Sequence, residues 1–180
     1  MTELCRHIGQ FTDVPAGDIN VGGREIGYLF GQYKRIRDEY TGVLTGKGIP
    51  FGGSLARTEA TGYGLCYFAK EMLADAGKSF EGQRVVISGS GNVAIYANQK
   101  ATQLGGKVIA MSDSNGYIVD ENGIDYKVMK EIKEVKRARI KTYLDYVPTA
   151  KYVEGSQASG PSPATSPCPA PPRTSCPWPV

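Results

Sequence analysis

Residues 83–94 read QRVVISGSGNVA, a short apolar stretch that runs into a glycine-rich turn. A helical pattern follows over 93–104, and residues 107–112, KVIAMS, form a second apolar stretch that ends at Asp113. Strand, glycine turn, helix and strand within about 30 residues are typical of the βαβ unit of a parallel sheet. The sequence therefore predicts an α/β fold around this unit.

The glycine turn has the spacing G-x-G-x-x-A, which is typical of dinucleotide-binding loops. Gly89 allows the tight turn, Gly91 lets the backbone approach a pyrophosphate, and Ala94 lets helix and strand pack closely. The start of the helix then offers free N–H groups to an anion. A glycine turn that binds nothing is the alternative. We predict a cofactor-binding loop made of Gly89, Ser90, Gly91, Asn92 and Val93.

The acidic residue at the end of the second strand leaves the cofactor open. Asp113 could accept a hydrogen bond from a ribose 2′-hydroxyl and so favour NAD. Ser114 follows it, and the basic stretch 126–146, which we expect to be helical, carries Lys136 and Arg139. These cations could pair with the 2′-phosphate of NADP, or they could belong to a solvated helix face. Spacing alone does not decide between the two cofactors.

The chain around this unit contains fewer regular patterns. Residues 58–76 predict a long helix, with Gly77 as its C-cap. Residues 1–50 are rich in glycine and contain one amphipathic helical stretch at 25–35, so we expect them to pack on something larger because they cannot build a core alone. A short strand is expected at 151–153.

Composition excludes several classes of protein. Hydrophobic residues make up 41% and charged residues 22% of the 180, which is typical of a globular protein and excludes a collagen or a charged disordered tail. No apolar run approaches the roughly 18 residues of a membrane span, and no signal core follows Met1, so we expect a cytoplasmic protein without membrane contact. The net charge of +3 does not require nucleic acid, and the four cysteines lack zinc-site spacing.

Several motifs in order resemble the NADP-specific glutamate dehydrogenase family. They are TDVPAGD at 12–18, GGREIGY at 22–28, GQYK at 31–34, GGSLARTEATGYG at 52–64 and SGSGNVA at 88–94. The likeness covers Met1 to about Ser156. It implies a Rossmann-like, doubly wound parallel sheet, present in part, preceded by the end of a substrate domain. Residues 1–50 would close the substrate (dimerisation) domain, and 51–156 would begin the NADP-binding domain.

The resemblance also implies an activity and its residues. The family interconverts L-glutamate with 2-oxoglutarate and ammonia, and its intact members are homohexamers. Asp18 matches the aspartate that relays a proton to the substrate nitrogen, Gly17 matches a residue that contacts substrate, and Arg57 lies at a matching position nearby. Thr61 and Asn92 match residues that hold the nicotinamide. Without the family, Asp18 could simply belong to an Asx turn or cap a helix.

The family also favours one cofactor. Ser114, Lys136 and Arg139 match the region that reads the adenosine phosphate, which favours NADP. A serine-flanked aspartate such as Asp113 is compatible with NADP in this family. No lysine in 1–50 sits in the family's glycine-rich substrate motif, so we expect the chain to be inactive alone. The alternatives are a non-catalytic fragment that binds NADP(H) or pairs with other subunits, and a related leucine, phenylalanine or valine dehydrogenase.

Residues 157–180 differ in composition from the rest and hold eight of the 11 prolines. We expect them to be disordered. A synonymous choice of codons for 163–177, read two bases later, encodes Cys-Asp-Ile-Ala-Leu-Pro-Cys-Ala-Thr-Gln-Asn-Glu-Leu, which resembles the family's continuation. We interpret this tail as an out-of-frame translation of a glutamate dehydrogenase sequence. A genuine Pro-rich linker is the alternative.

Overall fold

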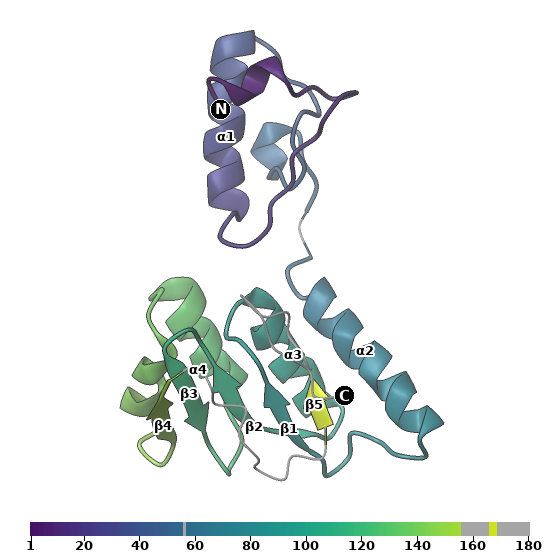
Figure 1. Ribbon diagram of the computed structural model, residues 1–180, viewed down its shortest axis with the longest axis vertical. Helices are drawn as coiled ribbons and strands as arrows, with labels where there is room; N and C mark the ends of the chain where they lie inside the picture. The colour runs from purple at the N-terminus through teal and green to yellow at the C-terminus, as the bar shows by residue number, and fades with distance from the viewer. Residues whose placement is uncertain (56, 156–165, 169–180) are drawn as a thin grey trace. The chain divides into compact units, whose positions relative to one another are not determined.

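The computed structural model describes residues 1–55, 57–155 and the backbone of 166–168 (Figure 1). The chain divides into two compact units, Met1–Arg57 and the part from Thr58 onward. This division lies later than the boundary after residue 50 that the sequence suggested.

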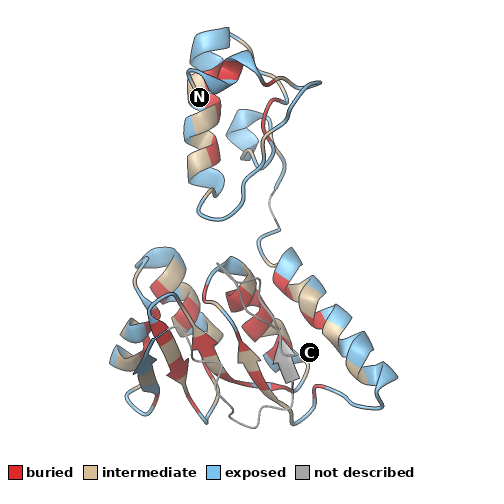
Figure 2. Ribbon diagram, in the orientation of Figure 1, coloured by how far each residue is buried: buried red, intermediate tan, exposed pale blue. Residues whose placement is uncertain are grey.

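The first unit is built around helix α1 (Gly23–Arg37), with short 3-10 turns η1 (Leu4–Arg6) and η2 (Ile49–Phe51). The helix begins where the Gly22 N–H donates to the carboxylate of Glu25 at 3.0 Å, a side-chain cap of the first turn. The prediction that this stretch builds no core is wrong. One face of α1 closes a small buried cluster of Cys5, Ile8, Phe30, Tyr33, Val43 and Leu44 (Figure 2).

The second unit contains a five-stranded mixed sheet with the order β4-β3-β2-β1-β5. The pairs β1–β2 and β1–β5 are parallel, whereas β2–β3 and β3–β4 are antiparallel. The strands are β1 (Arg84–Ile87), β2 (Lys107–Ser112), β3 (Gly116–Val119), β4 (Lys151–Glu154) and β5 (Ser166–Cys168). Strands near 83–88, 107–112 and 151–153 are confirmed, and so is the parallel pairing of β1 with β2. The sheet as a whole is mixed, whereas the sequence had suggested a parallel one.

The antiparallel edge follows from a tight turn that the sequence analysis missed. The Asp113 carboxylate accepts hydrogen bonds from the N–H groups of Asn115 at 2.8 Å and Gly116 at 3.2 Å. This is an Asx-type turn, and it reverses the chain directly after β2. A parallel return would need a crossover of a dozen or more residues, so a turn this short can only give a hairpin.

Strand β5 lies in the tail that we expected to be disordered. Its backbone pairs in parallel with β1, with Val85 opposite Ser166 and Ile87 opposite Cys168. For these three residues the expectation is wrong, because the unpaired edge of β1 offers hydrogen-bonding groups. An edge position also tolerates Pro167, which has no N–H to donate. The other residues of 157–180 lie outside the described part of the chain.

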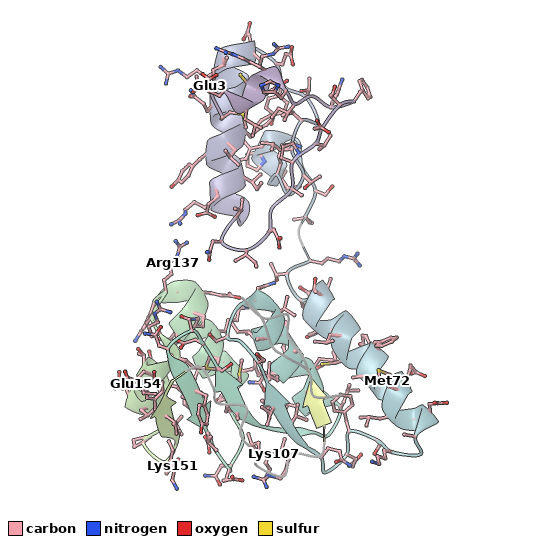
Figure 3. All side chains as sticks on the ribbon, viewed as in Figure 1. Glu3, Met72, Lys107, Arg137, Lys151 and Glu154 are labelled. Atoms are coloured by element: carbon pink, nitrogen blue, oxygen red, sulfur yellow. The ribbon has the colours of Figure 1, made fainter. Side chains whose placement is uncertain are left out.

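Helices α2 (Ala60–Asp75) and α3 (Asn92–Gln103) confirm the two helices expected there, with small shifts at their ends. They pack on each other, and α3 also packs on β1 and β2, around a core that includes Cys66, Val85 and Ala97, all fully buried. The outer side of α2 is different. Met72 is 61% exposed and points away from the sheet (Figure 3).

The basic stretch 126–146 is not one helix, contrary to the prediction. It begins with α4 (Tyr126–Lys130), continues as the π-helical turn η3 (Glu131–Val135), and ends with the 3-10 helix η4 (Ile140–Asp145). The break lies at Arg137, which has the left-handed φ of 52°. It directs the Ile140 N–H to the Asp113 carboxylate at 3.1 Å, a tertiary contact that a continuous helix would not make.

Candidate functional site

The glycine turn joins β1 to α3 and is tied to the end of β2. Gly89 has φ 98°, a conformation that favours glycine, and its N–H donates to the Ser112 hydroxyl at 2.9 Å. Gly91 is the N-cap of α3 and has no side chain to cap the helix. The N–H groups of the first turn, at Asn92 and Val93, therefore have no partner within the helix. They form a site that favours an anion.

The three small residues of the turn serve different purposes. A Cβ on Gly91 would meet no atom within 4 Å, so the chain's own packing does not require glycine there. Ala94 is 2% exposed and packs into the core, as the motif predicted. Ser90 is also buried. The open space above Gly91 is what a ligand approaching the backbone would need.

Asn92, the first residue of α3, and Thr61, in the first turn of α2, both lie beside the glycine turn. The Asn92 side-chain amide donates to the carbonyl of Thr58 at 2.7 Å. Gly62 packs against the backbone of α3, where its Cβ would lie 2.7 Å from the Val93 carbonyl oxygen. Thr61, exposed in the first turn of α2, is therefore held next to the start of α3. The structure brings both expected nicotinamide residues to the glycine turn.

The end of β2 brings together two of the residues expected to read a phosphate. The Arg139 guanidinium donates to the Ser114 hydroxyl at 2.8 Å, and both side chains are exposed. Asp113 directly precedes Ser114 in the sequence but acts differently. Its Oδ1 accepts from Asn115 and Gly116, and its Oδ2 accepts from Ile140. Both oxygens are thus used to hold the turn, while a cation and a hydroxyl face solvent.

Lys136 lies elsewhere. Its ammonium group is 3.9 Å from the Glu131 carboxylate and 4.7 Å from the centroid of the Tyr146 ring. The Tyr146 hydroxyl, and after it the nearby acidic groups, raise the pKa of Lys136. Because π-helical η3 and the break at Arg137 turn this residue toward η4, the structure joins Arg139 but not Lys136 with Ser114.

Gly17, Asp18 and Arg57 belong to the first unit. The turn after Gly17 closes with the Val21 N–H donating to the Asp18 carbonyl at 2.8 Å, and a Cβ on Gly17 would lie 2.6 Å from the Val21 carbonyl oxygen. Glycine is therefore required by the turn itself. The side chains of Asp18 and Arg57 are exposed. This turn presents a carboxylate to solvent on a short, sterically restricted loop.

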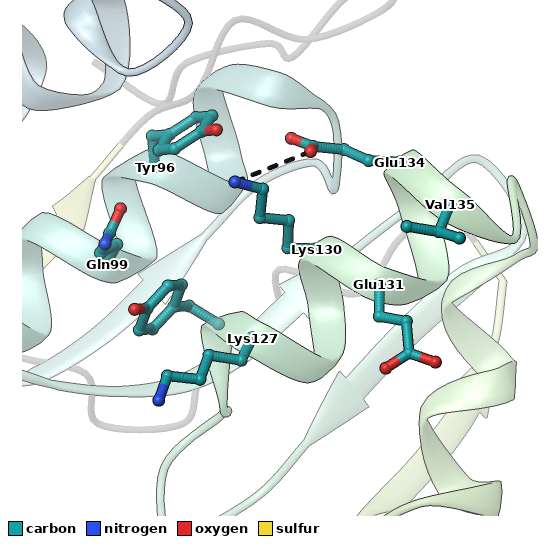
Figure 4. Close-up of a pocket in the computed structure, with 8 residues that line it drawn as sticks. Tyr96, Gln99, Lys127, Lys130, Glu131, Glu134 and Val135 are labelled. Atoms are coloured by element: carbon teal, nitrogen blue, oxygen red, sulfur yellow. Dashed lines mark ion pairs between the residues drawn. The ribbon is translucent and has the colours of Figure 1, made fainter.

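Sequence reasoning missed a polar cluster behind the glycine turn. A cavity of about 430 Å³ lies between α3 and the α4–η3 segment (Figure 4). Tyr96 and Lys130 line it, and Lys130 is 3.9 Å from Glu134. Tyr96 follows Val93, Ala94 and Ile95, so the pattern indicated only a core position. Its hydroxyl could have indicated a further role, because a buried tyrosine hydroxyl usually forms a hydrogen bond.

The described residues contain neither a cluster of metal ligands nor a helix that could span a membrane. Nowhere in 1–55 and 57–155 do three or more histidine, cysteine, aspartate or glutamate side chains gather as metal ligands would. Within the same ranges, no helix has the length and apolar character that crossing a bilayer requires.

Comparison with known proteins confirms the resemblance. The family model for glutamate/leucine/phenylalanine/valine dehydrogenase matches residues 52–170, and the model for the dimerisation domain of the same enzymes matches residues 1–35. The NADP-specific glutamate dehydrogenase of Helicobacter pylori is 58% identical over 164 residues, covering 88% of this chain. NADP-specific glutamate dehydrogenase 1 of Saccharomyces cerevisiae is 60% identical over 139 residues, covering 76% of this chain.

Solved structures of glutamate dehydrogenases also resemble this chain in fold. The glutamate dehydrogenase of Plasmodium falciparum superposes with a TM-score of 0.76 at 53% identity, covering 86% of this chain and 34% of that one. The chain spans only 37% of the length of the Helicobacter relative and 31% of the yeast one. The family model nevertheless matches more than half of the residues, in the part that holds the glycine turn. The chain belongs to the glutamate/leucine/phenylalanine/valine dehydrogenase family.

Proposed function

We propose that the chain is part of an NADP-dependent glutamate dehydrogenase, which interconverts L-glutamate with 2-oxoglutarate and ammonia. The observation that carries the choice of cofactor is the Ser114–Arg139 pair at the end of β2. A guanidinium that points to solvent beside a hydroxyl suits a phosphate, whereas a free carboxylate would suit a ribose hydroxyl. The oxygens of Asp113 already hold the hairpin turn and Ile140.

In this proposal the second unit begins a doubly wound nucleotide-binding domain. NADP supplies the hydride acceptor and donor when bound. The N–H groups at the start of α3 hold its pyrophosphate, with Gly89, Ser90, Gly91, Asn92 and Val93 forming the loop. Arg139 and Ser114 hold the 2′-phosphate, and Lys136 adds positive charge at longer range. The parallel β1–α3–β2 unit and the open space at Gly91 support this assignment.

The substrate side of the proposal rests on the first unit. Asp18 is assigned the proton relay to the substrate nitrogen, because an amine must lose a proton as hydride leaves, and a carboxylate can accept it. Gly17 and Arg57 are assigned substrate contacts. The dimerisation-domain match over 1–35 supports a homo-oligomer. A similar solved structure from Thermus thermophilus, 26% identical with a TM-score of 0.68, is described as a hetero-hexameric glutamate dehydrogenase.

A titration of this chain with NADPH and NADH tests the cofactor assignment. Binding is followed by the change in nicotinamide fluorescence at fixed salt. We expect NADPH to bind at least about tenfold more tightly, since charge-assisted hydrogen bonds to a phosphate contribute about 1.5–3 kcal/mol. Equal affinities, or tighter NADH binding, would reject NADP.

Gly91→Ala is expected to weaken NADPH binding about tenfold while leaving the free energy of unfolding almost unchanged. The new methyl group meets no protein atom within 4 Å, and Gly91 has an extended backbone with φ −81° that alanine adopts freely. The methyl group would, however, occupy the space through which a pyrophosphate approaches the N–H groups of α3. Urea unfolding and the NADPH titration measure the two effects separately. A binding affinity equal to that of the unchanged protein would place the pyrophosphate elsewhere.

A further inference from the structure

A line of polar contacts runs behind the glycine turn and ends at Asn92. Tyr96, one turn into α3, is 8% exposed, and its hydroxyl is hydrogen-bonded to the hydroxyl of Thr58 at 3.1 Å. The carbonyl of the same Thr58 accepts the hydrogen bond from the Asn92 side-chain amide at 2.7 Å. Thr58 thus contacts Tyr96 through its hydroxyl and Asn92 through its carbonyl. Holding the Thr58 hydroxyl therefore also restrains the carbonyl that Asn92 uses.

Tyr96 is itself held on two sides. The Lys130 ammonium lies 5.3 Å from the centroid of the Tyr96 ring and 3.9 Å from the Glu134 carboxylate (Figure 4). The Tyr96 hydroxyl first, and the Glu134 carboxylate second, raise the pKa of Lys130. The Tyr63 ring packs edge-on against Tyr96 with centroids 6.4 Å apart. A side chain confined in this way can act as a fixed support.

The contact to Thr58 gives the Asn92 amide a direction. Because its NH₂ group donates to Thr58, its Oδ1 is on the opposite side of the planar amide. Among the described residues Oδ1 has no hydrogen-bond partner. It therefore presents an acceptor at the exposed start of α3, beside the glycine turn. An acceptor at that point would select a ligand group that donates, such as the carboxamide NH₂ of nicotinamide.

We propose that Tyr96 is a positioning residue that acts through Thr58 to set the orientation of the Asn92 amide, and so the recognition of the nicotinamide end of the cofactor. The part that concerns nicotinamide rests on the proposed function. Tyr96 touches no ligand in this proposal. Its effect should appear only with ligands that contact the side-chain amide of Asn92, not with those that contact only the backbone N–H groups of the glycine turn.

Tyr96→Phe separates this role from a structural one, because it keeps the ring in place and removes only the hydroxyl. We expect NADPH to bind about fivefold more weakly, the effect of one net hydrogen bond. Binding of 2′,5′-ADP, which carries the 2′-phosphate and a 5′-phosphate but no nicotinamide, should stay unchanged. Tyr63→Phe is the matched control on α2, and both ligands should bind it as they bind the unchanged protein. Equal weakening of both ligands by Tyr96→Phe would overturn the proposal.

The side-chain amide signals of Asn92 in a ¹⁵N-resolved NMR spectrum provide a readout that needs no ligand. We expect them to shift, and their exchange with water to become faster, in Tyr96→Phe but not in Tyr63→Phe. Unchanged Asn92 signals in Tyr96→Phe would overturn the positioning role whatever binds. If the signals respond to Tyr96 while the unchanged protein binds neither NADPH nor 2′,5′-ADP, the positioning role stands and the proposed cofactor is wrong.

Discussion

Replacing Gly62 with alanine is expected to lower the free energy of unfolding by about 2 kcal/mol, although alanine is the better helix former. A Cβ at this position would lie 2.7 Å from the Ala97 nitrogen, 2.7 Å from the Val93 carbonyl oxygen and 2.9 Å from the Tyr96 carbonyl carbon. All three atoms belong to the backbone of α3, so no side chain can turn aside. Helix α2 must move instead, and overpacking of this kind costs about 1–3 kcal/mol.

The same substitution elsewhere on α2 should have the opposite sign, which makes it a matched control. A Cβ on Gly64 would meet no atom within 4 Å, so Gly64→Ala adds helix propensity without a clash. We expect it to stabilise the protein by about 1 kcal/mol. Urea unfolding followed by circular dichroism compares the two variants directly. Equal effects of the same sign would show that α2 does not pack on α3 at Gly62.

This contact also links stability to the site. Thr58 and Thr61 flank the start of α2, and Gly62 determines how closely that end approaches the glycine turn. A displacement of α2 would therefore move the Thr58 carbonyl away from the Asn92 amide. Gly62→Ala should weaken NADPH binding as well as lower stability, whereas Gly91→Ala should affect binding only. The two glycines thus serve separate purposes, one in packing and one in leaving room for a ligand.

The βαβ unit could be predicted because its signals are local. Apolar runs of strand length, the spacing of Gly89, Gly91 and Ala94, and a helical period between them all lie within one short segment. The hairpin after β2 was missed because its signal is only four residues long. It depends on which backbone N–H groups donate hydrogen bonds to the Asp113 carboxylate. The sequence suggested Asp113 as an acceptor for the ribose hydroxyl. Both of its carboxylate oxygens instead accept hydrogen bonds from backbone N–H groups of the chain.

The break in the basic stretch could not be read from the sequence. Arg137 is not a residue type that favours a left-handed conformation, and its φ of 52° coincides with the contact between the Ile140 N–H and Asp113. That contact joins segments 27 positions apart. Tertiary packing therefore overrides helix propensity here. The consequence for the site is that Arg139 and Lys136, three residues apart, are held by different partners.

Replacing Arg139 with alanine is expected to weaken NADPH binding about 10- to 100-fold and to leave NADH binding nearly unchanged. The guanidinium is fixed by its 2.8 Å hydrogen bond to Ser114, and its remaining N–H donors are free to meet a phosphate in the planar geometry that arginine favours. Loss of charge-assisted hydrogen bonds worth about 1.5–3 kcal/mol sets the size of the effect. Parallel fluorescence titrations with the two cofactors give the ratio of affinities.

Lys136→Ala removes the same charge from the same stretch and is the control for mere electrostatic attraction. Its ammonium group is engaged by Glu131 and Tyr146, so we expect NADPH binding to fall by only about twofold to threefold, an effect that salt should screen. If both variants weakened NADPH binding alike, positive charge in general would explain the preference. A loss of selectivity confined to Arg139→Ala would mean that cofactor choice depends on the break at Arg137, which brings Arg139 to Ser114 and turns Lys136 away.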